Sequence, residues 1–98
     1  MSPSRFVFHP DAVEEARAAR LWYQERSAHA AHGFLAELSR AFTLIAQDPE
    51  AWQAYPGGDR RFGLHAYPFL VAYRVVGDQI QIVAVAHQRR RPQYWRYK

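Results

Sequence analysis

The regular spacing of apolar residues in the middle of the chain predicts a helix. Four of them recur at intervals of four, three and four residues and would share one helical face: Phe34, Leu38, Ala41 and Ile45. Gly33 lies within this pattern at a cost of about 1 kcal/mol relative to alanine, so the pattern does not fix where the helix begins. We expect a break between this helix and the preceding one near residues 27–30.

The N-terminal part of the chain predicts a strand followed by an earlier helix. Residues 5–8, Arg-Phe-Val-Phe, are aromatic and β-branched, and they stop before Pro10, which cannot donate a hydrogen bond to a neighbouring strand. Asp11 and Glu14 have the spacing of a capping box, and Pro10 suits a first helical turn. A helix with a loose apolar stripe is therefore expected from here to about Ser27.

The second half of the chain alternates between turn-forming and β-forming segments. Residues 48–59 are rich in proline, glycine and aspartate, which predicts a structured loop. Three β-branched and aromatic segments follow, at residues 60–65, 69–76 and 79–87. Gly77-Asp78 separates the last two, which is typical of a tight hairpin.

The middle one of these three strands should be central in a sheet. Its two alternating sets of residues are both apolar, with Leu70 and Ala72 on one side and Phe69, Val71 and Tyr73 on the other, so both faces should be covered. The predicted fold class is therefore α+β, with a helical hairpin packed on a small antiparallel β-sheet in the order β-α-α-β-β-β.

Composition narrows the class of protein. Ninety-eight residues suit a single domain, 1–98, and a hydrophobic share of 49% with 22% charged residues predicts a folded chain. The chain has no cysteine, which excludes disulfides and thiolate chemistry and fits a reducing compartment. No apolar run reaches the roughly 18 residues of a membrane span, and residues 1–5 do not resemble a signal peptide. We expect a cytoplasmic protein without membrane contact.

Positive charge is concentrated in the second half of the chain. The net charge is +4, but residues 1–50 carry five arginines against seven acidic residues, whereas residues 51–98 carry eight basic residues against two acidic ones. The two halves therefore have net charges of −2 and +6. Such a field attracts polyanions or an acidic protein segment.

The densest chemical feature is the C-terminal segment, residues 87–98, which holds five of the thirteen basic residues and three aromatic ones. Guanidinium groups beside aromatic rings can bind phosphates and stack on bases. The alternative is a solvated basic tail whose Tyr94 and Trp95 fold back onto the sheet. The two interpretations are compatible, because Pro92 would separate cations at the sheet edge, residues 89–91, from an aromatic anchor.

Histidines give weaker candidates for chemistry. His65 and His87 each end a predicted strand and could act as a general acid or base, although an isolated strand-end histidine is more often structural. His29 and His32 are three residues apart, but no third ligand accompanies them, so we expect no metal site. Walker, dinucleotide-binding, G-x-S-x-G and zinc motifs do not occur, so no cofactor is expected.

Two long stretches of the chain resemble a known family. They are residues 60–75, R-R-F-G-L-H-A-Y-P-F-L-V-A-Y-R-V, and residues 83–95, V-A-V-A-H-Q-R-R-R-P-Q-Y-W, of which the ending H-Q-R-R-x-P-x-Y-W is the most specific part. They resemble the ParE branch of the RelE/ParE toxins of type II toxin–antitoxin modules, also known as plasmid stabilization proteins. The resemblance extends upstream through residues 8–10, 22–23 and 34–37. It implies two helices on an antiparallel sheet.

The resemblance also implies a growth-arresting toxin that a cognate antitoxin neutralises. Characterised ParE-type members poison DNA gyrase, whereas RelE-type members cleave mRNA in the ribosome with basic residues on the sheet. The central-strand position where RelE-type enzymes have an arginine falls here on Leu70, which favours gyrase as the target. In the ribonuclease alternative the catalytic candidates would be His87, Arg89 and Tyr94. An inactive toxin or a nucleic-acid-binding module is a third alternative.

Two interaction surfaces are expected from this resemblance and from the charge distribution. The residues expected to contact the target belong to the basic ending: Arg89, Arg90, Arg91 and Tyr94. The residues expected to bind an acidic, partly disordered antitoxin are arginines of the predicted strands: Arg60, Arg61 and Arg74. Such binding would give a toxin–antitoxin hetero-oligomer.

Overall fold

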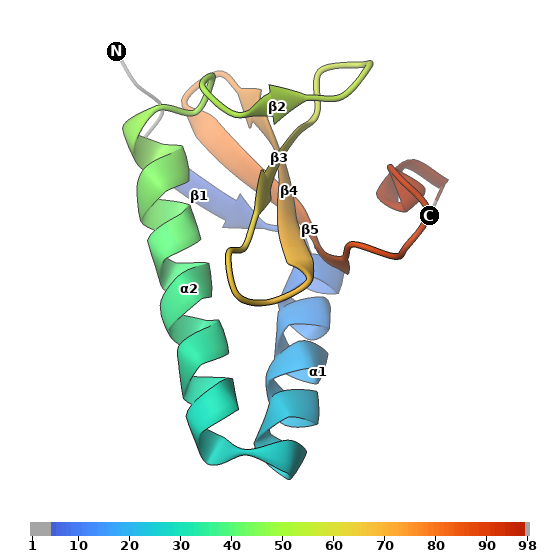
Figure 1. The fold of residues 1–98 in the computed structure, drawn as a ribbon. Coiled ribbons are helices and arrows are strands. Elements are labelled where there is room, and N and C mark those ends of the chain that lie inside the picture. Colours follow the sequence, from blue (N-terminus) through green and yellow to red (C-terminus); the bar gives the residue numbers. More distant parts are fainter. Residues whose placement is uncertain (1–4, 98) are drawn as a thin grey trace.

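Two helices and a five-stranded sheet make up a computed structural model of the chain, which describes residues 5–97 (Figure 1). The helices are α1 (Pro10–Arg26) and α2 (Ala28–Gln47). The strands are β1 (Arg5–Phe8), β2 (Gln53–Ala54), β3 (Arg60–Gly63), β4 (Phe69–Val76) and β5 (Gln79–His87). A short 3₁₀ helix, η1 (Tyr94–Tyr97), follows. Residues 1–4 of the N-terminus and Lys98 of the predicted tail lie outside the described residues.

The sheet has the strand order β1-β5-β4-β3-β2. Strands β2 to β5 pair antiparallel, but β1 pairs parallel with β5, from Arg5 opposite Gln79 to Phe8 opposite Ile82. The α+β class and the helical hairpin are confirmed, whereas the sheet is mixed and gains the two-residue strand β2 within the predicted loop. Because no hairpin turn joins β1 to β5, turn geometry does not impose antiparallel pairing on them.

The two helices meet at a single residue. Ser27 caps both, since its N–H donates to the Tyr23 carbonyl at 2.8 Å and its hydroxyl accepts from the Ala30 N–H at 3.1 Å. The predicted break at residues 27–30 is therefore only one residue long. This abrupt reversal places α1 and α2 side by side, and their hairpin extends beyond the end of the sheet (Figure 1).

The N-terminus of α1 is capped by a residue that the sequence pattern did not indicate. His9 is the cap, because its Nδ1 accepts from the Asp11 N–H at 3.0 Å. The predicted capping box of Asp11 and Glu14 is wrong, since Pro10 already begins the helix and Asp11 therefore lies inside it. Glu14 instead pairs with Arg17 one turn later, at 3.0 Å.

Gly33 lies inside α2, where a tyrosine approaches the helix backbone. The Tyr67 hydroxyl donates to the Ala30 carbonyl at 2.7 Å, and a Cβ atom at Gly33 would collide with that hydroxyl oxygen. The glycine weakens the helix locally but lets the Tyr67 ring pack edge-to-face against Tyr23 and Phe34.

Each face of the sheet carries its own core. The helix-side core includes the whole predicted face of α2, all buried: Phe34, Leu38, Ala41 and Ile45. On the opposite face, small and branched residues of β4 and β5 are covered by two aromatic residues of η1: Leu70, Ala72, Ala84, Ala86, Tyr94 and Trp95. Burial of β4 on both faces and the folding back of the C-terminal aromatics are thus confirmed.

An irregularity in β5 keeps both cores apolar. The register between β4 and β5 shifts at Tyr73, which leaves Val83 as an extra residue in β5. The alternation of side chains between the two faces of the sheet moves by one residue at this bulge. Ile82 before the bulge and Val85 after it therefore both belong to the helix-side core. Pairing with β1 stops at Ile82, and α1 packs along β5. This arrangement brings α1 to the start of the C-terminal segment.

Candidate functional site

The candidate site is built around the basic turn, residues 88–92, which follows β5 directly. Arg89, Arg90 and Arg91 are all exposed there. The turn is held by His87, whose Nδ1 accepts from the Arg89 N–H at 3.1 Å and whose carbonyl accepts from the Arg90 N–H at 3.0 Å. Gln93 then reverses the chain with a positive φ of 57°. The three predicted target-contact arginines therefore lie together on one protruding turn.

A buried carboxylate fastens η1 behind the basic turn. Asp59 is only 1% exposed, and its Oδ2 accepts from Trp95 Nε1 at 2.8 Å and from Arg96 Nε at 3.1 Å. Arg74 Nε lies 3.1 Å from the other oxygen, but its N–H does not point along that line, so this contact is an ion pair rather than a directed hydrogen bond. Paired and hydrogen-bonded in this way, the carboxylate is stable out of water.

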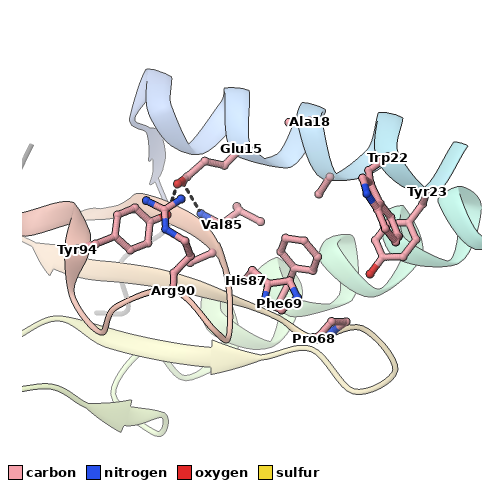
Figure 2. A pocket seen from close by; sticks show the side chains of 12 residues that line it. Glu15, Ala18, Trp22, Tyr23, Pro68, Phe69, Val85, His87, Arg90 and Tyr94 are labelled. Carbon is pink, nitrogen blue, oxygen red and sulfur yellow. Dashed lines mark hydrogen bonds between the residues drawn. The ribbon is translucent and has the colours of Figure 1, made fainter. Parts of the chain in front are cut away.

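A second carboxylate fastens the other side of the C-terminal segment. Glu15 of α1 accepts from the Val85 N–H of β5 at 3.0 Å and, with its second oxygen, from the Tyr94 hydroxyl (Figure 2). The guanidinium carbon of Arg90 lies 3.9 Å from the centre of the Tyr94 ring, a cation–π contact. Burial, together with the hydrogen bond to Glu15, raises the pKa of Tyr94 well above its usual value of 10. The hydroxyl therefore keeps its proton at neutral pH.

A groove of about 530 Å³ lies beside this arrangement, between α1 and β5 (Figure 2). Glu15, Arg90 and Tyr94 lie at one end of it, and Trp22 and Tyr23 lie at the other. Its lining is largely apolar, and Trp22 is 51% exposed. A half-exposed tryptophan at the mouth of an apolar groove is typical of a binding surface.

The arginines predicted to bind an antitoxin differ in how far their charges are already paired. Arg60 donates from Nη1 to the carbonyls of Glu50 at 3.0 Å and Trp52 at 2.8 Å, and so holds the loop before β2. Arg74 is engaged by the buried carboxylate. Arg61 makes no hydrogen bond or ion pair with any residue in the range 5–97, so it alone has an uncommitted charge.

The remaining predicted residues have structural contacts. The exposed His65 lies in the β3–β4 loop, where its N–H and that of Ala66 donate to the carboxylate of Glu37 at 2.7 and 3.0 Å.

Within residues 5–97 no three histidine, aspartate or glutamate side chains gather as a metal site. None of the helices described is long and apolar enough to cross a bilayer.

Sequence reasoning missed Glu15 and Asp59. Acidic residues are common in the segments where these two carboxylates lie. Glu15 is in the first part of a helix, and Asp59 follows a glycine-rich turn. Their partners are 15 to 79 residues away in the chain. No local spacing connects such pairs.

Comparison with known proteins agrees with this geometry. A family profile described as the ParE toxin of the type II toxin–antitoxin system parDE matches residues 6–92. A solved chain from the chromosomal ParDE toxin–antitoxin system of P. aeruginosa is similar in fold, with a TM-score of 0.75 and 18% sequence identity over 87% of this chain and 96% of that one. No curated protein matches the chain in sequence. Because the family match covers both helices and, apart from Arg5, every strand, this chain belongs to the ParE toxins of type II toxin–antitoxin systems.

Proposed function

We propose that this ParE toxin arrests bacterial growth by inhibiting DNA gyrase, and that its cognate ParD antitoxin neutralises it. The family supplies the toxin role and implies an antitoxin partner. The choice of gyrase over mRNA rests on the sheet face opposite the helices.

Around Leu70 that face is covered by apolar and aromatic side chains, which is the observation that carries the proposal. Leu70, at the position where RelE-type enzymes have an arginine, is only 6% exposed and packs beneath η1 with Tyr94 and Trp95. Cleavage of RNA through its 2′-OH needs a base, an acid and a cation around the phosphate. Aromatic side chains occupy the surface where such groups would have to act.

The three ribonuclease candidates also have other tasks. His87 Nδ1 accepts a backbone hydrogen bond, and the His87 ring packs edge-to-face on Phe69. The Tyr94 hydroxyl donates to Glu15 and has a raised pKa, so it is a poor base at neutral pH. Arg89 alone would remain for charge stabilisation, which favours an inhibitor that acts by binding.

The target surface that we propose is the basic turn supported by Tyr94. Arg89, Arg90 and Arg91 are exposed on the same turn, and a cluster of guanidinium groups suits contact with an acidic protein surface or with the DNA that gyrase holds. Tyr94 contributes as the platform beneath Arg90.

For the antitoxin, we propose an acidic segment that contacts the strand arginines Arg60, Arg61 and Arg74. Arg61 should contribute most to this contact, because its charge is not committed to another described residue, whereas Arg60 and Arg74 already have partners. The net charge of +6 in residues 51–98 favours such a partner.

A paired assay tests the target. Purified toxin should inhibit DNA supercoiling by gyrase and leave mRNA intact in translating ribosomes. A variant with Arg89, Arg90 and Arg91 all replaced by alanine should lose inhibition while staying folded at the assay temperature. Exposed arginines contribute at most about 0.5 kcal/mol each to stability, and the contact between Arg90 and the Tyr94 ring adds about 0.5–1 kcal/mol. Cleaved mRNA with unaffected gyrase would instead establish the ribonuclease alternative.

A further inference from the structure

We propose that Glu15 is a positioning residue for the toxic surface: through the Tyr94 ring it sets where Arg90 is presented. This inference rests on the proposed function of the basic turn. It concerns a residue of α1 that is distant in sequence from the turn that it controls.

The position of Glu15 follows from the end of β1. Pairing between β1 and β5 stops at Ile82, whose carbonyl accepts from the His9 N–H at 2.9 Å, so β5 continues without a strand neighbour on that edge. Three residues later, Glu15 accepts the N–H of Val85 on this edge. One oxygen of the carboxylate thereby replaces the missing strand and fixes Glu15 to the sheet.

The second oxygen of Glu15 is then available for the C-terminal segment. It accepts from the Tyr94 hydroxyl, and this hydrogen bond fixes the direction in which the ring points. Arg90 lies over that ring with its guanidinium carbon 3.9 Å from the ring centre. Figure 2 shows the sequence of contacts, with Glu15 directed from α1 toward Tyr94 and Arg90 in front of the ring.

The two carboxylates that hold the C-terminal segment have different consequences. Asp59 binds Trp95 and Arg96, which follow the basic turn. Glu15 binds Tyr94, whose ring lies against the guanidinium group of Arg90 in the turn. Loss of Asp59 should therefore lower stability, whereas loss of Glu15 should also displace Arg90.

The test compares Glu15→Ala with Glu37→Ala. Glu37 is a matched control because its carboxylate also joins a helix to the backbone of the sheet region, at His65 and Ala66, without contacting the C-terminal segment. The first readout is the NMR shift of the Arg90 side-chain protons, which the Tyr94 ring current moves upfield while the two are stacked. The second is the toxin concentration that half-inhibits gyrase, measured where every variant is fully folded.

We expect the Arg90 upfield shift to disappear in Glu15→Ala and to persist in Glu37→Ala. Inhibition should weaken about tenfold in the first variant, comparable to losing one charge-assisted hydrogen bond, and remain unchanged in the second. Tyr94→Phe, which keeps the ring but lacks the hydroxyl, should reproduce part of this loss of inhibition. In the Tyr94→Phe background, Glu15→Ala should weaken inhibition less than it does in the wild-type background.

Two outcomes would overturn the inference: an Arg90 shift that survives Glu15→Ala, or full inhibition by a variant in which that shift is lost. Failure of the proposed function is distinguishable, because the wild-type toxin would then leave gyrase unaffected. In that case the NMR comparison still decides whether Glu15 positions Arg90, and growth arrest replaces gyrase inhibition as the second readout.

Discussion

Single carboxylates and their aromatic partners hold the C-terminal segment of this toxin in place. Trp95 is only 8% exposed and gives its indole N–H to the buried Asp59. Tyr94 is similarly enclosed and gives its hydroxyl to Glu15. These aromatic side chains combine a large apolar area with one polar atom that must find a partner when buried. The contribution of each can be separated by mutation.

Replacement of Trp95 by alanine should lower the free energy of unfolding by about 3 kcal/mol, because it empties the core between η1 and the sheet and removes a donor from Asp59. Urea unfolding monitored by circular dichroism measures this change. Arg89→Ala is the control, since the Arg89 side chain is exposed and the substitution should alter stability by no more than about 0.5 kcal/mol. Equal stability of the two variants would contradict the anchoring role of Trp95.

Tyr73 makes stability depend on alkaline pH. Burial raises the pKa of Tyr73 to about 12, from 10 in the unfolded chain. The folded state therefore holds this proton more tightly, so the stabilisation is complete below pH 10 and is lost as the pH rises from 10 to 12. The loss should amount to roughly 2 kcal/mol, and Tyr94 acts in the same direction.

The measurement is the free energy of unfolding at a series of pH values between 9 and 12. The Tyr73→Phe variant should be less stable at neutral pH, because the Pro49 carbonyl loses its hydrogen-bond donor, but its stability should decline less steeply above pH 10. An alkaline decline as steep as in the wild type would show that Tyr73 is not the group responsible.

At the scale of elements, helix propensity and tertiary packing compete within α2. Propensity alone says that alanine at Gly33 should stabilise the helix by about 1 kcal/mol. The Tyr67 hydroxyl, fixed by its hydrogen bond to the Ala30 carbonyl, occupies the space that the alanine Cβ would need. Packing decides whether the substitution stabilises or destabilises the protein, because adding an atom where there is no room costs about 1–3 kcal/mol.

We therefore expect Gly33→Ala to destabilise the wild-type protein by about 1 kcal/mol. In the background of Tyr67→Phe, which removes only the colliding oxygen, the same substitution should be neutral or stabilising. Thermal or urea unfolding of the four proteins in this double-mutant cycle gives the coupling energy. Additive effects of the two substitutions would refute the steric explanation.

The hairpin and bulge of the central strands illustrate the same competition between local and tertiary preferences. Gly77 has a positive φ of 60°, whereas the φ of Asp78 is not positive. This combination fits a type II′ turn between β4 and β5. The turn residues alone predicted this connection. The bulge at Val83 has no such local signal, since it resolves a conflict between two cores on opposite faces of the sheet.

For the molecule as a whole, positive charge gathers on the sheet face opposite the helices. Arg61 of β3 lies beside the basic turn, since it lines the same small cavity as Arg90 and Arg91. An antitoxin segment bound at Arg61 would therefore approach the proposed target surface. Binding of an acidic partner to such a surface should be steered by long-range attraction.

Arg61→Glu should weaken binding of the purified ParD antitoxin about fivefold and reduce the salt dependence of the association rate, because a peripheral charge acts mainly on that rate. Arg5→Glu is the control, since it makes the same change of charge at the exposed β1 edge. Surface plasmon resonance at several salt concentrations measures both variants. Equal weakening by the two would mean that only net charge matters, and no effect of either would exclude Arg61 from the interface.

The sequence by itself determined the elements, because their signals are local. Apolar spacing identified the buried face of α2, β-forming runs and a two-residue turn identified β4 and β5, and apolar residues in both alternating sets placed β4 at the centre. The grouping of Arg89, Arg90 and Arg91 on one turn was also visible, since they are consecutive. Each of these features depends on residues only a few positions apart.

Only the tertiary structure decided which distant residues meet. It made β1 parallel to β5, put the strand arginines into different environments, and brought Glu15 to Val85 and Tyr94 across 70 and 79 positions of the chain. The physical reason is that a carboxylate on a helix has the same local signature whether it faces water or accepts two hydrogen bonds from the sheet side. Packing of α1 along the open edge of β5 selects the second alternative here, and with it the support for Arg90.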